Sequence, residues 1–350
     1  MVNRCYFRQW CVRSLVLVPL MVLAAASTPA AAAEPGKTIR VGIIGLDTSH
    51  VPAFTKLINN ADNTGDMAGV RVVAGFPGGS PDIPDSADRL EKFTEQIRQM
   101  GVEIVPSIDE LLKRVDAVLL ESVDGRPHLE QVRPVLAARK PVFIDKPVAG
   151  SLADAIEIFR LAGEQKVPCF CSSSARFGPT LQALIKDPKL GALQGCASFS
   201  PCHLEPHHPD LFWYGIHGVE ILYTVMGQGC KTVTRVQAES AEVAVGVWAD
   251  GRVGSFRGLK GKGAGYGAVL FGSKGIENVS RSEGYAPLVA EICKFFKTGV
   301  APVSAAETIE LYAFMEAADE SKRQGGCPVS IESVMAKARQ QNAQRGDKGR

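Results

Sequence analysis

A lysine that directly follows a predicted buried strand is the first residue able to do acid–base chemistry. The triplet Asp145-Lys146-Pro147 comes straight after the apolar run 141–144. Pro147 favours an extended backbone at the residue before it, and parallel α/β sheets bind ligands at the carboxyl ends of their strands. A lysine there can donate to a substrate hydroxyl or to a cofactor, and a partly desolvated lysine can relay protons. The alternative is an exposed lysine in a loop.

A second candidate is the histidine of the segment 215–220, Gly-Ile-His-Gly-Val-Glu. His217 and Glu220 are three residues apart, so a helix would place them on one face. A carboxylate beside an imidazole can set its tautomer and raise its basicity. The alternative is a histidine whose hydrogen bonds are satisfied within the core of a second domain.

The segment from Gly45 to His50 follows an apolar strand and is typical of the turn that opens a dinucleotide-binding unit. Aligned on G-x-G-x-x-G, Gly45 takes the first position, but Asp47 and His50 replace the second and third glycines. A carboxylate at the second position would sit near the anion that a helix N-terminus attracts. Three interpretations stay open. Asp47, Thr48 or Ser49 caps the helix, Asp47 and His50 line a repurposed pocket, or Asp47 points away and leaves nucleotide binding intact.

The segment 201–210 concentrates side chains that are able to bind a metal. They lack the spacing of a structural zinc site and no second cluster of ligands is evident, so we predict no metal site. A loop that contacts substrate, with His203 as the candidate residue, or a plain surface loop is favoured instead. Trp213, in the aromatic run that follows, offers a flat apolar face for a sugar ring or a core anchor for the next helix. The candidate metal ligands are Cys202, His203, Glu205, His207, His208 and Asp210.

The apolar pattern predicts two scaffolds in succession for these residues. From about residue 38 to 171, short apolar strands alternate with helices, which favours a doubly wound parallel sheet in an α/β fold. After about residue 190, strands follow one another with few helices between them, which predicts an α+β domain with a mostly antiparallel sheet. We therefore expect a Rossmann-type nucleotide-binding domain at 34–150, an α+β substrate and oligomerisation domain at 151–338, and a frayed tail at 339–350.

The order of the motifs is more specific than any one of them. A nucleotide turn at 45–50, the strand-end triplet 145–147, the segment Arg176-Phe177-Gly178-Pro179 and the 215–220 helix follow one another. In this order the chain resembles the glucose–fructose oxidoreductase / inositol dehydrogenase / MocA (Gfo/Idh/MocA) family over nearly all of its length after residue 33. The resemblance implies an NAD(P)-linked oxidoreductase that acts on a hydroxyl of a sugar, cyclitol or related polyol.

The resemblance also implies roles for individual residues. Lys146 would contact the substrate and the nicotinamide region, and His217 would be the general acid/base on the hydroxyl being oxidised. Glu220 would take the place of the family's aspartate, and Arg176 would lie near the wall of the active site. Hydride transfer would belong to NAD or NADP, and the protein would supply orientation and the proton relay. The residues implied to line the cofactor are Gly45, Leu46, Asp47, Thr48, Ser49, His50, Ser122, Val123, His128, Asp145 and Lys146.

Two further departures from the family pattern keep other functions open. Asp145 shortens the usual glutamate by one methylene, and the segment 74–80 has no acid where the adenosine ribose is normally held. Ser80 would suit a 2′-phosphate, but no arginine stands beside it, so the choice between NAD and NADP is open. The first alternative is a carbohydrate-binding or scaffolding protein with a vestigial nucleotide site. The second is a lyase or hydrolase that uses Lys146 and His217.

The first 33 residues resemble a bacterial export signal, with three arginines, an apolar run at 15–24 and a small-residue site at 31–33. The run is short for a membrane span, so we expect a periplasmic or extracellular protein without stable membrane insertion after cleavage. Free nucleotide is scarce there, which favours a tightly held, internally recycled cofactor. Cleavage would lower the formal charge from +2 by three arginines to −1, which gives no case for a nucleic-acid partner. A homo-oligomer is plausible by analogy only, and buried structural thiols are expected at Cys169 and Cys171.

Overall fold

The structure is a computed structural model that describes residues 37–261 and 263–348. The predicted export signal at 1–33 lies outside these residues. Within the described part of the chain, no helix combines the length and the apolar character that a membrane crossing requires.

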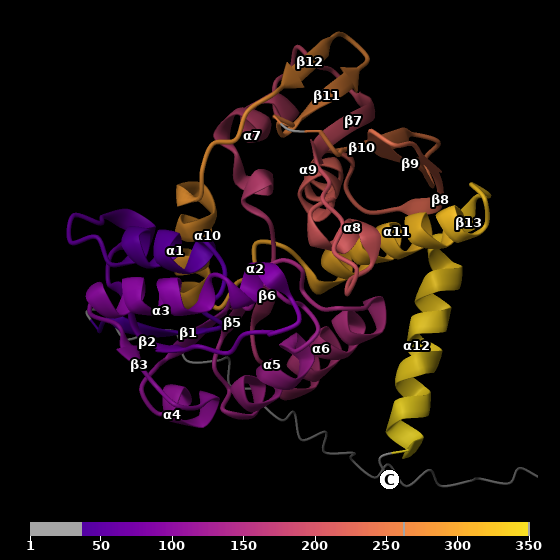
Figure 1. Ribbon diagram of the computed structural model, residues 1–350. Coiled ribbons are helices and arrows are strands. Elements are labelled where there is room, and N and C mark those ends of the chain that lie inside the picture. The colour runs from indigo at the N-terminus through magenta and orange to yellow at the C-terminus, as the bar shows by residue number, and fades with distance from the viewer. Residues whose placement is uncertain (1–36, 262, 349–350) are drawn as a thin grey trace, which may run out of the picture. The chain divides into compact units, whose positions relative to one another are not determined.

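Six strands form the first sheet, and every pairing in it is parallel (Figure 1). The strand order is β3-β2-β1-β4-β5-β6, so the strands are added outward on one side of β1 and then, from β4 onward, on its other side. Ligands of open α/β sheets bind at such a switch point, outside the carboxyl ends of the strands. The predicted doubly wound parallel sheet is confirmed. Its strands are β1 (Ile39–Ile44), β2 (Val70–Phe76), β3 (Glu103–Ile104), β4 (Ala117–Leu120), β5 (Val142–Ile144) and β6 (Cys169–Cys171).

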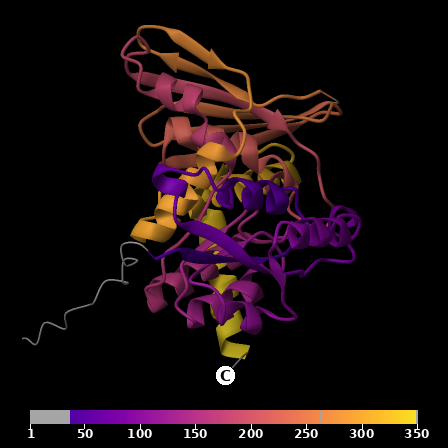
Figure 2. The ribbon, with the colours of Figure 1, turned by 90° about the vertical axis from the view of Figure 1, so that its left-hand side faces the viewer.

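Helices cover both faces of this sheet because its strands are apolar on both sides. In β4, Leu119 packs into the cluster beneath α1, whereas Leu120 packs into the cluster beneath α5. The helices on the first face are α1 (His50–Ile58), α3 (Leu90–Gln99) and α10 (Ala286–Thr298), and those on the second are α4 (Ile108–Leu112), α5 (His128–Ala137) and α6 (Leu152–Gln165). Two views at right angles show this layering (Figures 1 and 2). Short helices at the rim are η1 (Gly65–Met67) and α2 (Pro84–Ala87).

Two segments differ from the predicted domain limits. Strand β6 pairs with β5, so the first sheet continues past residue 150 to Cys171. The cysteines of β6 are free thiols; Cys171 is buried, Cys169 is half-buried, and burial raises the pKa of Cys169 to about 12. At the other end, α12 (Ile331–Lys348) is helical through most of the segment predicted to fray.

Seven strands form the second sheet in the order β12-β11-β7-β10-β9-β8-β13. All of its pairings are antiparallel except that between β7 and β10, so the predicted mostly antiparallel sheet is confirmed. Helices α9 (Ile216–Met226) and α11 (Ala305–Arg323) pack on one of its faces. The strands are β7 (Leu193–Pro201), β8 (Cys230–Gln237), β9 (Ala241–Trp248), β10 (Val253–Leu259), β11 (Gly267–Gly272), β12 (Ile276–Val279) and β13 (Val329–Ser330). Connecting helices are η2 (Ser174–Phe177), α7 (Pro179–Ile185) and α8 (Asp210–Trp213).

Candidate active site

The lysine and the histidine singled out in the sequence line the same cavity, which has a volume of about 230 Å³. Lys146 follows β5, and His217 is the second residue of α9. The Lys146 Nζ atom lies 5.7 Å from the centroid of the Tyr214 ring, and the rings of Tyr214 and His217 are 5.5 Å apart. An amine from the first sheet and an imidazole from the second domain therefore converge on one space.

A serine, not the expected glutamate, holds the imidazole of His217. The Nδ1 atom lies 2.7 Å from the Ser173 hydroxyl oxygen, which also accepts the Ala175 N–H at 3.2 Å. Glu220 accepts hydrogen bonds from Ser172 and from the Arg176 guanidinium instead, because a full positive charge is the stronger partner for a buried carboxylate. Burial lowers the pKa of His217 well below its ordinary value, so the imidazole is neutral near pH 7.

The ammonium of Lys146 is free to meet a ligand. The residue is 8% exposed, and among the described residues its Nζ atom has no hydrogen bond and no ion pair. The neighbouring Asp145 does not neutralise it, because its two oxygens accept from the imidazole of His50 at 2.6 Å and from the Lys146 backbone N–H at 2.8 Å. A buried, unpaired cation favours a ligand oxygen with negative character.

The side chains of the two residues that break the glycine pattern lie in different places. His50 reaches from the first turn of α1 to Asp145 and lines the cavity. Asp47 is fully buried and turned away from the cavity, where it accepts the Val123 N–H at 2.9 Å and the Ser86 hydroxyl at 2.5 Å. Burial raises the pKa of Asp47. Asp47 therefore points away from the cavity, as one of the open interpretations has it, and His50 lines the cavity, as another has it.

The first glycine of the pattern is required by the fold. Gly45 has a φ of +84°, and a Cβ at this position would lie 2.3 Å from the backbone of Ser122. Any other residue would push β1 and β4 apart at the switch point. Strand β1 and the loop after β4 thus meet as they do in a nucleotide-binding unit.

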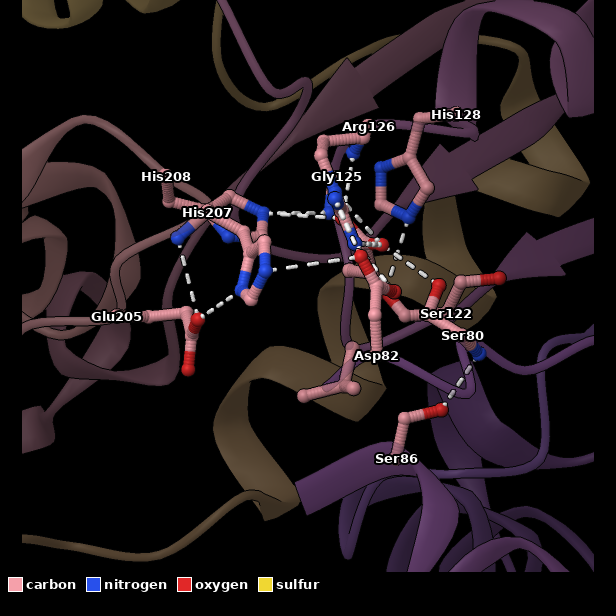
Figure 3. A network of polar contacts seen from close by, with 12 residues as sticks. Ser80, Asp82, Ser86, Ser122, Gly125, Arg126, His128, Glu205, His207 and His208 are labelled. Carbon is pink, nitrogen blue, oxygen red and sulfur yellow. Dashed lines mark hydrogen bonds and ion pairs between the residues drawn. The ribbon is translucent and has the colours of Figure 1, made fainter. Parts of the chain in front are cut away.

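Two of the potential metal ligands of the 201–210 segment, His207 and His208, contact the first domain (Figure 3). His208 Nε2 lies 3.1 Å from both the Gly125 nitrogen and Asp124 Oδ1, and His207 pairs with Glu205 at 2.6 Å. Arg126 bridges Asp124 and Asp82, each at 2.8 Å, and so joins the loop after β4 to the loop after β2. Within the described residues, no group of three or more His, Cys, Asp or Glu side chains is arranged to hold a metal ion.

Comparisons with known proteins agree with this geometry. Residues 39–173 match the model of an oxidoreductase family with an NAD-binding Rossmann fold, Gfo/Idh/MocA. The matched residues are those of the first domain, so its likeness is to the Gfo/Idh/MocA family. YceM of Salmonella typhimurium, whose oxidoreductase name is provisional, is 28% identical over 148 residues, or 42% of this chain. The match covers 43% of YceM, less than half of that curated relative.

Solved structures of two inositol dehydrogenases share the fold over both domains. Scyllo-inositol dehydrogenase from Lactobacillus casei, with NAD(H) and scyllo-inositol bound, superposes with a TM-score of 0.69 at 15% identity, covering 85% of this chain and 100% of that one. Myo-inositol dehydrogenase from the same organism, with NAD(H) and myo-inositol, gives 0.66 at 16% identity, covering 84% and 96%. At these identities the likeness establishes the fold alone.

One end of the cavity carries groups that suit a phosphate. Thr48 and Ser49 line it at the N-terminus of α1, where Ser49 makes no side-chain capping bond. Helix N-termini attract phosphate, and with Asp47 turned away no carboxylate from this turn opposes one. Arg89, paired with Asp85 at 2.6 Å, also lines this end.

Not all of the residues assigned from the sequence reach the cavity. Val123 and Trp213 line it, together with Lys146, His217, Thr48, Ser49 and His50. The following do not line it: Gly45, Leu46, Asp47, Ser122, His128, Asp145, Arg176, His203 and Glu220. Of these, His128 is buried between the carbonyls of Ser122 and Val148, and Arg176 is paired with Glu220 and Glu307. These contacts place both side chains behind the cavity as support.

Several residues that line the cavity were not predicted from the sequence. Tyr214, Tyr266 and Tyr285 surround the imidazoles, and Arg281 and Glu283 come from the loop before α10. Tyr214 belongs to the same aromatic run as Trp213, whereas the 281–285 loop carries no sequence motif. Ser80, considered for a 2′-phosphate, donates to Asp124 at 2.6 Å instead.

Proposed function

We propose that this protein is an oxidoreductase that uses NAD or NADP to oxidise, or in reverse to form, a hydroxyl of a sugar, cyclitol or related polyol. The observation that carries the proposal is the convergence of Lys146 and His217 in one cavity at the switch point of a Gfo/Idh/MocA fold. The inositol dehydrogenases of similar fold bind NAD(H) and a cyclitol, which supports a polyol as the small-molecule partner.

The residues divide the proton chemistry between them. His217, neutral and held at Nδ1 by Ser173, presents Nε2 to the substrate and accepts the hydroxyl proton during oxidation. Lys146 donates to the same oxygen and stabilises the negative charge that develops on it. Trp213 and Tyr214 give the apolar surface on which the ring carbons of a polyol pack.

A bound nicotinamide would supply the hydride acceptor that these side chains lack. Thr48 and Ser49 would hold its phosphate at the start of α1, and Val123 and Lys146 would flank the nicotinamide. If the 1–33 segment directs export, a cofactor that stays bound and is recycled within one catalytic cycle suits a compartment with little free nucleotide.

The function is tested by asking whether the isolated protein carries nucleotide. Protein purified without added cofactor is denatured, and the released small molecules are analysed for NAD(H) and NADP(H). We expect bound nucleotide and cofactor-linked turnover of a polyol from a panel that begins with scyllo-inositol and myo-inositol. An empty protein that also binds neither nucleotide in a titration followed by tryptophan fluorescence would reject the redox function.

We also propose that copies of the chain associate through the open face of the second sheet. On the face away from α9 and α11, Val247 and Val253 are paired across strands and are 42% and 48% exposed, and Phe271 pairs with the exposed Ile276. A contiguous exposed apolar face marks an interface. Light scattering should show an oligomer that Val247→Glu dissociates and Val300→Glu, at an exposed site outside the sheets, leaves intact. A monomeric wild type would contradict this.

A further inference from the structure

The cavity holds a second imidazole that the proposed oxidation does not use. His50 Nδ1 lies 2.6 Å from Asp145 Oδ2. Its ring stacks on Phe54, with centroids 5.1 Å apart, and meets the edge of Tyr285 at 4.8 Å. These contacts fix the ring, and its Nε2 atom has no hydrogen-bond partner within 37–261 and 263–348. A carboxylate that orients an imidazole whose other nitrogen is free is the arrangement of an acid–base catalyst.

Of two neighbouring buried carboxyl groups, Asp145 and Glu121, it is Asp145 that carries the negative charge. Glu121 follows β4 next to Asp145, because Leu120 pairs with Ile144 in the parallel register. Both carboxyl oxygens of Glu121 are buried without a partner among the described residues. Burial, aided by the charge of Asp145, holds the pKa of Glu121 well above its ordinary range. For Asp145 burial acts in the same direction, but His50 and Lys146 outweigh it and the pKa lies below its ordinary value. The ionised carboxylate is therefore the one that His50 contacts.

Three side-chain nitrogens meet in this cavity. His50 comes from α1, Lys146 from the end of β5 and His217 from α9 of the second domain. Each of these residues is 8% exposed. All three line the same cavity, and the Tyr214 ring lies 5.7 Å from Lys146 Nζ and 5.5 Å from the His217 ring. An ammonium and two imidazoles in one cavity match a ligand with a carbonyl oxygen and an adjacent carbon-bound proton.

We propose that this cavity also catalyses a redox-neutral enolisation of a polyhydroxylated ketone, with His50 and His217 as the two proton-transferring residues and Lys146 at the carbonyl oxygen. The inference rests on the proposed function in one respect, that polyols and their ketones bind in this cavity. It needs no nucleotide.

The step balances without an oxidant or reductant. One imidazole removes the proton from the carbon beside the carbonyl, the C–H electron pair becomes a C=C bond, and the carbonyl π pair moves to the oxygen held by Lys146. The second imidazole, in its protonated form, returns a proton to carbon as the enolate collapses. Return to the opposite face of the same carbon inverts its configuration. Return to the former carbonyl carbon moves the ketone to its neighbour, because the proton of the neighbouring hydroxyl passes to the former carbonyl oxygen. Exchange with solvent restores both imidazoles.

Deuterium exchange into a cyclitol ketone tests the proposal. The full chain is incubated with scyllo-inosose in D2O without nucleotide. Proton NMR follows the signals of the protons on the carbons beside the carbonyl. We expect exchange well above the buffer rate. His50→Gln and His217→Gln should each slow it by about 10²-fold or more, the usual contribution of a positioned acid or base. His207→Gln, which changes an imidazole outside the cavity, is the matched control and should exchange as the wild type does.

Asp145→Asn gives a second variant that keeps His50 but removes the ionised carboxylate. It should lose exchange while still binding scyllo-inosose in calorimetry, and it decides the matter if His50→Gln fails to fold. Wild-type exchange at the buffer rate, or an Asp145→Asn or folded His50→Gln variant that exchanges at the wild-type rate, overturns the inference. Nucleotide-linked oxidation of scyllo-inositol is measured in parallel. Oxidation without exchange rejects this inference alone, and exchange without oxidation rejects only the redox function.

Discussion

Replacing Lys146 by methionine should lower kcat for polyol oxidation by about 10²- to 10⁴-fold, with a much smaller change in KM. The ammonium is nearly buried and unpaired within the described chain, so its charge is directed at the ligand. Methionine keeps an apolar stem beside the Tyr214 ring and removes the donor to the oxygen that becomes negative in the transition state. Steady-state kinetics on the polyol that the wild type turns over would separate kcat from KM.

Lys113→Met is the matched control for this prediction. Lys113 is an exposed residue that pairs with Glu110 at 2.6 Å next to α4, outside the cavity. Its replacement should leave both constants unchanged and cost little stability, because exposed ion pairs contribute about 0–1 kcal/mol. A Lys146→Met variant with the wild-type kcat and an intact melting transition would remove the lysine from the proposed chemistry.

The sequence predicts the scaffold well because each strand of the first sheet is a short apolar run followed by a helix signal. The motif at 145–147 and the helix at 215–220 can each be recognised from local sequence. Their side chains lie in one cavity because the topology of the fold brings the two segments together. Strand β6 was harder to assign to the first domain. Cys169 to Cys171 form a pattern too short to show which sheet they join, and only the pairing with β5 decides it.

The hydrogen-bond partners of the site residues were harder to predict from the sequence than the places of these residues in the fold. The spacing of His217 and Glu220 suggested a pair, but it contains no information on Arg176, which takes the carboxylate, or on Ser173, which takes the imidazole. Both competitors come from the segment after β6. A helical face tells which residues are near each other, whereas the choice among neighbours depends on charges that arrive from elsewhere in the fold.

The altered glycine positions illustrate the same limit. From sequence, Asp47 endangers nucleotide binding because it lies at the helix N-terminus. In the fold, the Ser86 hydroxyl from α2 and the Val123 N–H hold its carboxylate away from the cavity. His50 replaces a glycine that normally lets the helix pack closely, and its imidazole uses that position to reach Asp145. One departure is therefore structural, and the other adds a functional group to the cavity.

Replacing Arg235 by methionine should lower the free energy of unfolding by about 3–5 kcal/mol, the cost of removing one partner from a buried ion pair. The guanidinium is fully buried and contacts Glu242 and Asp210, each at 2.8 Å, and also Asp319. Methionine would leave the two buried carboxylates of Glu242 and Asp319 without their shared cation. Urea denaturation followed by circular dichroism would measure the loss.

The size of this effect depends on burial, and Arg252→Met isolates that dependence. Arg252 pairs with Asp250 at 2.7 Å, but the Asp250 side chain is 54% exposed, so the change should cost no more than about 1 kcal/mol. Asp210 begins α8, the helix that carries Trp213 to the cavity, and its backbone N–H donates to Asp319 at 3.0 Å. Loosening this network should therefore also weaken polyol binding. Equal losses of stability in the two arginine variants would show that the buried cluster contributes no more than a surface pair, and that α8 is held by its apolar contacts instead.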